Sequence, residues 1–159
     1  MEQIKNFLKI SEHIGTAGQP TEEQFPALKE AGYEVVVNLA MPTSTNAIPN
    51  EGELVTSQGM IYVHLPVKWE APSSKDLDHF FHIMEANAGN KVLVHCALNM
   101  RVSAFMYLYR VIHQGLSISD AQKQLHQIWQ PDGVWQNFID NELANYGKTA
   151  ESSQQVKPL

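Results

Sequence analysis

The sequence is poor in cysteine, in basic residues and in long hydrophobic runs, and each shortage excludes a class of protein. A single cysteine rules out an internal disulfide and a cysteine-rich zinc site. With 11 basic and 17 acidic residues the formal net charge is -6, which argues against a nucleic-acid partner. No stretch reaches the roughly 18 apolar residues of a membrane span, and the N-terminal segment MEQIKNFLKISEHIG lacks the features of a signal peptide. We therefore expect a cytoplasmic protein with no membrane partner.

Three short apolar runs, at residues 34–40, 61–67 and 92–97, are rich in β-branched side chains. They are apolar at nearly every position, which is typical of strands buried on both faces of a parallel sheet. A further strand is expected near residues 7–10, at the edge of the sheet. Three or four short strands of this kind define a small, mainly parallel sheet.

Capping and stop signals divide the rest of the chain into helices. Thr21 and Gln24 form a capping box, and Ser119 is expected to open a later helix. The predicted helices span residues 21–32, 50–59, 75–87, 101–114, 119–130 and 134–146. Alternation of strands and helices predicts a three-layer α/β fold. We expect one domain over residues 1–147 and a polar C-terminal tail over residues 148–159.

The segment VLVHCALNMRVSAF, residues 92–105, carries the chemistry. Ligands of an open parallel sheet bind beyond the carboxyl ends of its strands, where a following helix points its free N–H groups. Cys96 stands at such a junction. The helix N-terminus and the charge of Arg101 both favour a thiolate and an anionic ligand there. A buried structural cysteine is the alternative interpretation.

His95-Cys96, a short loop, Arg101 and a long helix together resemble the active-site loop of the protein tyrosine phosphatase superfamily, which includes the dual-specificity enzymes. The upstream segments SEHIGTAGQP, AGYEVVVNLA and GMIYVHLPV are similar to a bacterial phosphatase-like family associated with β-lactamase-like hydrolases. The resemblance covers about residues 7–115. It implies a phosphatase-like fold and a cysteine nucleophile.

The loop departs from the superfamily pattern, which is Cys-x5-Arg followed by Ser or Thr, with a central glycine. Here the spacing is Cys-x4-Arg, Asn99 replaces the glycine and Val102 follows the arginine. If Ser103 is aligned with the Ser or Thr of the pattern, the loop has its full length and Arg101 lies one position too early. If Arg101 is aligned with the arginine of the pattern, the loop is one residue short, which is the spacing of rhodanese-like sulfurtransferases. Asn99 tolerates the left-handed backbone that a glycine would adopt, and its amide could bond the anion.

The resemblance also implies the roles of individual residues. Cys96 is the expected nucleophile, Arg101 and the backbone N–H groups of the loop hold the substrate, and His95 orients the loop. Glu70, on the loop after the preceding strand, is the favoured general acid, ahead of Asp76 and Asp78. The expected substrate-binding residues are Ala97, Leu98, Asn99, Met100, Val102 and Ser103.

Other polar and aromatic groups have simpler interpretations. His79, His82 and Glu85 lie on one helix face at spacings that could bind a metal, but a polar helix face is the expected state, and we expect neither a metal nor a cofactor. Trp129, Trp135 and Phe138 are expected to pack the C-terminal helices.

Three functions remain open at this point. The first is phosphomonoester hydrolysis through a phosphocysteine, on a phosphorylated small molecule or a phosphopeptide. The second is a phosphatase-like module that binds an inorganic anion or a partner at the Cys96 loop without turnover. The third is rhodanese-like sulfur transfer, which is supported by the loop spacing alone.

Overall fold

The computed structural model describes residues 1–147, so the predicted polar tail lies outside the described residues. The strands are β1 (Leu8–Lys9), β2 (Ile14–Ala17), β3 (Val35–Asn38), β4 (Ile61–His64) and β5 (Val92–His95). The helices are α1 (Gln24–Glu30), α2 (Glu51–Ser57), α3 (Ser74–Ala86), α4 (Met100–Ile112), α5 (Ile118–His126) and α6 (Gly133–Asn145).

The five strands form one sheet in the order β1-β2-β5-β3-β4. Only the β1–β2 pair is antiparallel, and the other neighbours run parallel. The expected α/β fold with a mainly parallel sheet is therefore confirmed. Because the parallel strands end together, Ala17, His95, Asn38 and His64 lie side by side at one edge of the sheet.

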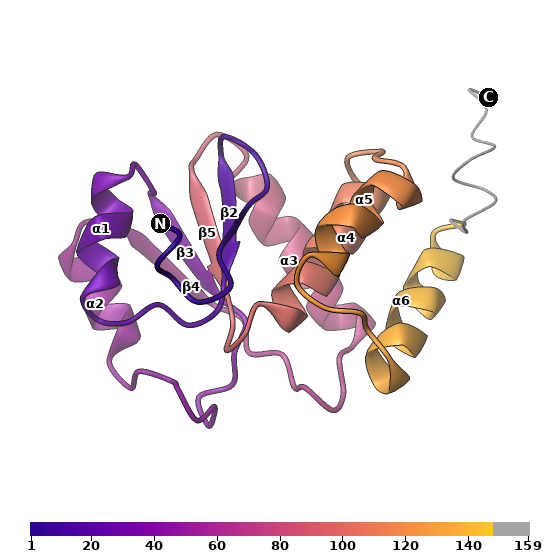
Figure 1. The fold of residues 1–159 in the computed structure, drawn as a ribbon, viewed down its shortest axis with the longest axis horizontal. Coiled ribbons are helices and arrows are strands. Elements are labelled where there is room, and N and C mark those ends of the chain that lie inside the picture. The colour runs from indigo at the N-terminus through magenta and orange to yellow at the C-terminus, as the bar shows by residue number, and fades with distance from the viewer. Residues whose placement is uncertain (148–159) are drawn as a thin grey trace.

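Helices cover both faces of the sheet, giving three layers (Figure 1). Helices α1 and α2 lie on one face, and α3 to α6 lie on the other, where α4 contacts α3, α5 and α6. Helix α4 is almost entirely buried, as predicted from its apolar sequence. None of the helices in residues 1–147 is long and apolar enough to cross a membrane.

Strand β5 supplies side chains to two separate cores because successive side chains of a strand point to opposite faces. Val92 and Val94 pack with α3, α4 and α6 on one side. Leu93 packs with Phe25 of α1 and Val55 of α2 on the other. Continued beyond the strand, the same alternation places Cys96 on the α4 side and His95 on the α2 side.

The structure corrects the predicted strands in two places. Strand β2, which pairs with β5, was not predicted, because Ile14–Ala17 contains Gly15 and Thr16 in place of a continuous apolar run. Strand β4 is not buried on both faces. It is an edge strand, and the Ile61 side chain is exposed.

Several helix ends also differ from the prediction. Helix α5 is capped by Ser117, whose side chain accepts the Asp120 N–H, and not by Ser119. Asn50 occupies the N-cap of α2 without a side-chain bond. Helix α3 ends at Ala86, and Asn87 provides its C-cap. These ends are set by local hydrogen bonds that neighbouring polar residues could equally have made.

Candidate active site

Cys96 is the first residue after β5, and it lies four positions before the start of α4 at Met100. Its side chain is 1% exposed and lines a pocket of about 240 Å³. The pocket is bounded by Trp69, Cys96, Ala97, Leu98, Met100 and Arg101. The structure thus brings five of the predicted site residues together around one cavity, and adds Trp69.

The carbonyl groups of the loop after Cys96 are held by donors from other segments. The Ala97 carbonyl accepts from the Gln19 N–H at 3.1 Å and from the Asn46 amide at 3.2 Å. The Leu98 carbonyl accepts from the Asn6 amide at 3.0 Å. The C=O and N–H bonds of a trans peptide group point in opposite directions. Fixing the Ala97 and Leu98 carbonyls therefore directs the N–H groups of Leu98 and Asn99 the other way. A loop of this kind is suited to an anion.

The helix that follows adds to this preference. Intrahelical bonding of α4 starts with the Ser103 N–H, which donates to the Asn99 carbonyl at 2.9 Å. The N–H groups of Met100, Arg101 and Val102 therefore precede the first helical hydrogen bond. They carry the positive end of the helix dipole to the mouth of the pocket.

Asn99 takes the place of the superfamily glycine without changing the backbone that a glycine would adopt. Its φ is 68°, in the left-handed region, as the sequence predicted. Its amide, however, does not point to an anion site. It donates to the Asn6 carbonyl at 2.9 Å and to Thr16 Oγ1 at 3.1 Å. Asn99 therefore secures the loop from behind in this structure.

Arg101 lines the pocket and is almost fully buried. One arm of its guanidinium, Nη1, donates to the Val67 carbonyl at 3.0 Å. That bond anchors the side chain at the carboxyl end of the neighbouring segment while leaving other N–H donors for a ligand. Arg101 therefore lines the same cavity as Cys96, although only four residues separate the two in the sequence.

Val102 and Ser103 do not line this pocket. The Val102 side chain belongs to the hydrophobic core. Ser103 Oγ donates to the Met100 carbonyl at 3.0 Å and accepts from Trp129 Nε1 at 3.0 Å. The predicted role of Ser103 in substrate binding has no support from these contacts, and only the backbone of Val102 remains available.

Trp69 forms an exposed wall of the pocket that the sequence analysis had not assigned. Its ring packs against Trp129 and Trp135 at centroid distances of 5.4 and 5.6 Å. Trp135 Nε1 also donates to the Trp69 carbonyl at 2.8 Å. The C-terminal helices thus pack as expected, and they also support one side of the pocket.

The carboxylates proposed as general acids lie outside the cavity. Glu70 is exposed on the loop beside Trp69 and is not among the lining residues. Asp78 is exposed and accepts a hydrogen bond from the Tyr146 hydroxyl. Glu70 stays a prediction, supported by its neighbour Trp69 and not by contact with the pocket.

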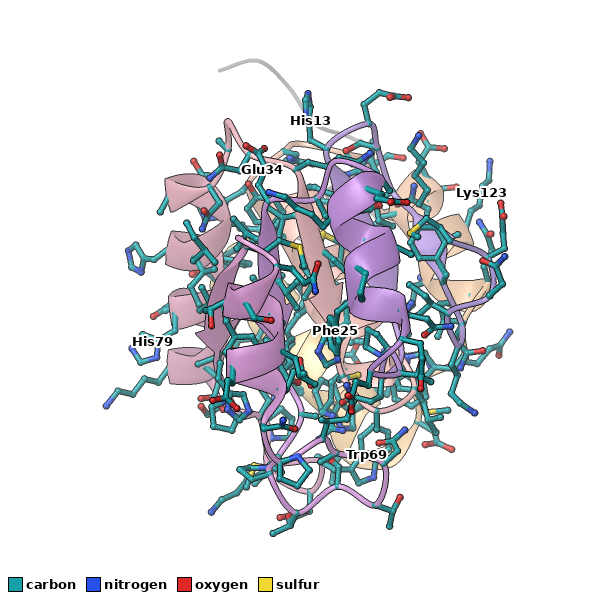
Figure 2. All side chains as sticks on the ribbon, turned by 90° about the vertical axis from the view of Figure 1, so that its left-hand side faces the viewer. His13, Phe25, Glu34, Trp69, His79 and Lys123 are labelled. Atoms are coloured by element: carbon teal, nitrogen blue, oxygen red, sulfur yellow. The ribbon has the colours of Figure 1, made fainter. Side chains whose placement is uncertain are left out.

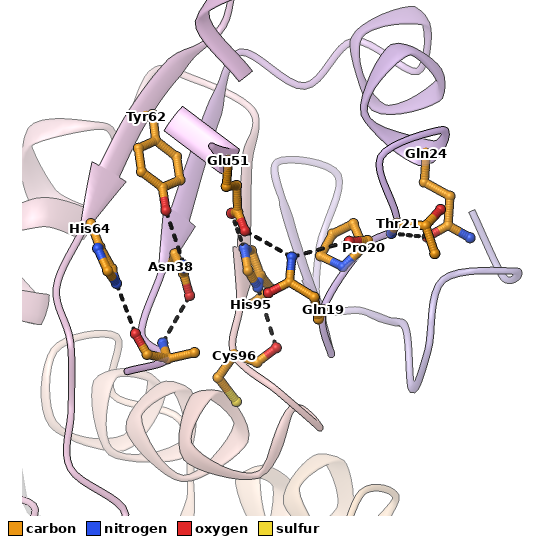
Figure 3. A network of polar contacts seen from close by, with 11 residues as sticks. Gln19, Pro20, Thr21, Gln24, Asn38, Glu51, Tyr62, His64, His95 and Cys96 are labelled. Carbon is orange, nitrogen blue, oxygen red and sulfur yellow. Dashed lines mark hydrogen bonds and ion pairs between the residues drawn. The ribbon is translucent and has the colours of Figure 1, made fainter. Parts of the chain in front are cut away.

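A buried polar network joins Gln19, Glu51 and His95 beside Cys96 (Figure 3). His95 Nε2 is 2.5 Å from Glu51 Oε2, and Gln19 Nε2 donates to Glu51 Oε1 at 2.8 Å. His95 Nδ1 lies 3.3 Å from the Cys96 carbonyl oxygen. Glu51 and Gln19 were missed by sequence reasoning, because an acid in the first turn of a helix usually serves the helix dipole.

The helix face carrying His79, His82 and Glu85 is polar and exposed, and Figure 2 shows His79 pointing outward. Glu85 accepts a hydrogen bond from the Tyr109 hydroxyl at 2.7 Å. Within residues 1–147, no group of three or more His, Cys, Asp or Glu side chains is arranged to hold a metal ion.

The sheet order and the Cys96 loop define a phosphatase-like α/β fold, and comparison with known proteins agrees. A family model described as a DSP-PTPase phosphatase fused to NAD+ kinase matches residues 3–140. A DUF442 protein from Shewanella putrefaciens CN-32, named as a candidate phosphatase, is 36% identical over 92% of this chain and 96% of that one, with a TM-score of 0.83. The chain belongs to the protein tyrosine and dual-specificity phosphatase superfamily.

More distant structures share the fold. TpbA from P. aeruginosa, in a variant complexed with pTyr, is 15% identical over 94% of this chain and 88% of that one, with a TM-score of 0.65. The core catalytic domain of the PP-IP phosphatase SIW14 from S. cerevisiae, complexed with citrate, is 15% identical over 96% and 91%, with a TM-score of 0.72. A comparison with curated proteins found no match.

Proposed function

We propose that the protein is a cysteine-dependent phosphatase that hydrolyses phosphomonoesters through a phosphocysteine. The observation that carries the proposal is the shared pocket, in which Cys96 meets Arg101 and the N-terminus of α4. A nucleophile, a cation and a set of backbone donors at one cavity are what in-line phosphoryl transfer requires. Family membership supports the same reaction class.

The reaction proceeds in two displacements. The Cys96 thiolate attacks phosphorus, an S–P bond forms and the P–O bond to the leaving group breaks, with the electron pair going to the departing oxygen. That oxygen receives a proton, for which Glu70 is the proposed donor. Water then attacks phosphorus and gives a proton to the Glu70 carboxylate, and the S–P bond breaks with its electron pair going to sulfur, which restores the thiolate and releases phosphate.

The pocket favours a phosphate on an apolar or aromatic carrier. Beside Arg101, its walls are Trp69, Leu98 and Met100, and the Trp69 and Leu98 side chains are 43% and 41% exposed. One cation among apolar walls suits a single phosphoryl group better than a polyphosphorylated one. Small aryl phosphates and phosphopeptides both meet this description.

The experiment is hydrolysis of an aryl phosphate from pH 5 to 8 by the purified protein and by Cys96→Ser. We expect turnover by the parent and a fall of at least about a thousandfold in the variant, because serine is a much weaker nucleophile at neutral pH. Since Cys96 is the chain's only cysteine, a phosphocysteine trapped by rapid acid quench would be assigned without ambiguity. Equal rates in the two proteins would exclude Cys96 as the nucleophile.

The second candidate function is anion binding without turnover. It is favoured by the hydrogen bond from Arg101 Nη1 to the Val67 carbonyl, because that bond leaves fewer guanidinium donors to stabilise a transferring phosphoryl group. Calorimetric binding of inorganic phosphate that disappears in Arg101→Ala, in a protein with no hydrolysis of any aryl phosphate, would select this function in place of the first.

A further inference from the structure

Glu51 has no part in the mechanism above, yet it is built into the back of the site. Its side chain is 3% exposed, and each of its oxygens has a hydrogen-bond partner, Gln19 Nε2 for Oε1 and His95 Nε2 for Oε2. A buried carboxyl group is costly to place unless its polar atoms are hydrogen-bonded. The His95 ring therefore satisfies one of the two Glu51 oxygens.

The contacts of His95 fix its protonation. Nδ1 faces the Cys96 carbonyl at 3.3 Å, and a carbonyl oxygen can only accept, so this contact is a hydrogen bond when Nδ1 carries a proton. Nε2 faces Glu51 Oε2, and one proton between the ring nitrogen and the carboxyl group satisfies that contact from either side. Both contacts are therefore made when the ring is protonated on Nδ1 and shares a second proton with Glu51.

The residues on either side of His95 in the sheet are uncharged. Its row neighbours in the sheet are Ala17 and Asn38. The Asn38 amide is engaged by the Tyr62 hydroxyl and the Ala40 N–H, and His64 at the end of β4 bonds the Ala40 carbonyl. Arg101 is the charged group on the opposite side, in the pocket.

We propose that Glu51 is a positioning residue for the Cys96 nucleophile and acts through His95. By sharing a proton with Nε2, the Glu51 carboxyl group keeps the other ring proton on Nδ1, where the N–H donates to the Cys96 carbonyl. That bond fixes the peptide after the nucleophile, so the N–H of Ala97 is directed to the other side, where the pocket lies. Figure 3 shows the Cys96 sulfur on the side away from the His95 ring. The proposal rests on the proposed function, since it gives Glu51 a role at the same cysteine.

The test compares Glu51→Gln with Glu142→Gln at pH 7. Both glutamates are buried, but Glu142 lies in α6 and accepts a hydrogen bond from Ser74, away from the pocket. The readout is the rate of iodoacetamide alkylation of Cys96, which requires no turnover. Thiol reactivity depends on the donors that stabilise the thiolate, so we expect alkylation to slow by about fivefold or more in Glu51→Gln and to change less than about twofold in Glu142→Gln. Circular dichroism and thermal melting verify that both variants are folded.

A folded Glu51→Gln that alkylates at the parental rate overturns the proposal. If the parent hydrolyses an aryl phosphate, kcat/KM should fall in Glu51→Gln by about the same factor as alkylation. If the parent hydrolyses none while Glu51→Gln still slows alkylation, the positioning role stands and the proposed function fails.

A measurement on the unmodified protein covers the case in which Glu51→Gln does not fold. Nitrogen-15 NMR of labelled histidines distinguishes an imidazolium from each neutral tautomer. We expect His95 Nδ1 to carry a proton at pH 7, because it faces the Cys96 carbonyl. A His95 ring protonated on Nε2 alone overturns the proposal.

Discussion

The backbone at Asn99 combines a left-handed turn with hydrogen bonds that a glycine could not make. Asparagine is one of the few residues that enters this region at low cost, and here its amide is bonded to Asn6 and to Thr16. Asn6 itself has a φ of 53°. Two left-handed asparagines joined by a hydrogen bond therefore support the loop that holds Cys96.

Replacing Asn99 separates these two contributions. Asn99→Ala loses both hydrogen bonds and keeps a Cβ in the left-handed region, so we expect the free energy of unfolding to fall by about 2–3 kcal/mol. Asn99→Gly loses the same bonds without the steric cost, and a fall of about 1 kcal/mol is expected. Urea denaturation measures both, and equal losses would contradict the role of the backbone conformation.

Sequence reasoning predicted more of the residues that line the Cys96 pocket than of those behind it. Cys96 and Arg101 are marked by their place between a strand and a helix, a local pattern. Glu51 is distant in sequence from His95, and nothing near it distinguishes it from an ordinary acid in a first helical turn. Pairing of this kind depends on the tertiary fold, which a single sequence does not reveal.

At the scale of elements, the sequence predicted those strands whose side chains are buried on both faces of the sheet. Residues of β3 and β5 are buried on both faces and give uninterrupted apolar runs. Strand β2 is equally internal in the sheet, but Gly15 lies against the Tyr33 ring and hydroxyl, where a side chain would not fit. Because β2 needs a glycine for this close contact, its sequence lacks the continuous apolar run from which the other internal strands were predicted.

The two serines near the start of α5 test how a helix end is set. Ser117 Oγ accepts the Asp120 N–H at 3.0 Å, whereas Ser119 is exposed within the first turn. We expect Ser117→Ala to lower the free energy of unfolding by about 1 kcal/mol, and Ser119→Ala to leave it within about 0.5 kcal/mol. Thermal or urea unfolding of the pair decides the matter, and the reverse order would show that α5 begins at Ser119.

At the scale of the whole molecule, α4 places tyrosines where their ionisation opposes folding. Burial, followed by the charge of Asp140, raises the pKa of Tyr107 to about 12. Burial and the hydrogen bond to Glu85 raise the pKa of Tyr109 to about 12. Both hydroxyls therefore keep their protons in the folded protein at pH values where an unfolded tyrosine loses them.

Alkaline unfolding should follow from these two shifts. Stability from the tyrosines is complete below about pH 10 and is lost as the pH rises toward 12, at no more than about 1.4 kcal/mol per pH unit for each group. Urea midpoints from pH 8 to 12 measure the loss. Tyr107→Phe removes one ionising group and should give a shallower decline than the parent, and parallel curves would contradict the assignment.

The alternation along β5 has a consequence for assembly of the site. His95 and Cys96 are adjacent in sequence but belong to opposite layers of the molecule, and the strand is paired in register with both β2 and β3. A slip of one residue would exchange the two faces, leaving the thiol against Glu51 and the imidazole in the cavity. The pairing of β5 on both sides therefore also keeps the thiol in the pocket, because the register that packs the two cores is the one that places Cys96 beside Arg101.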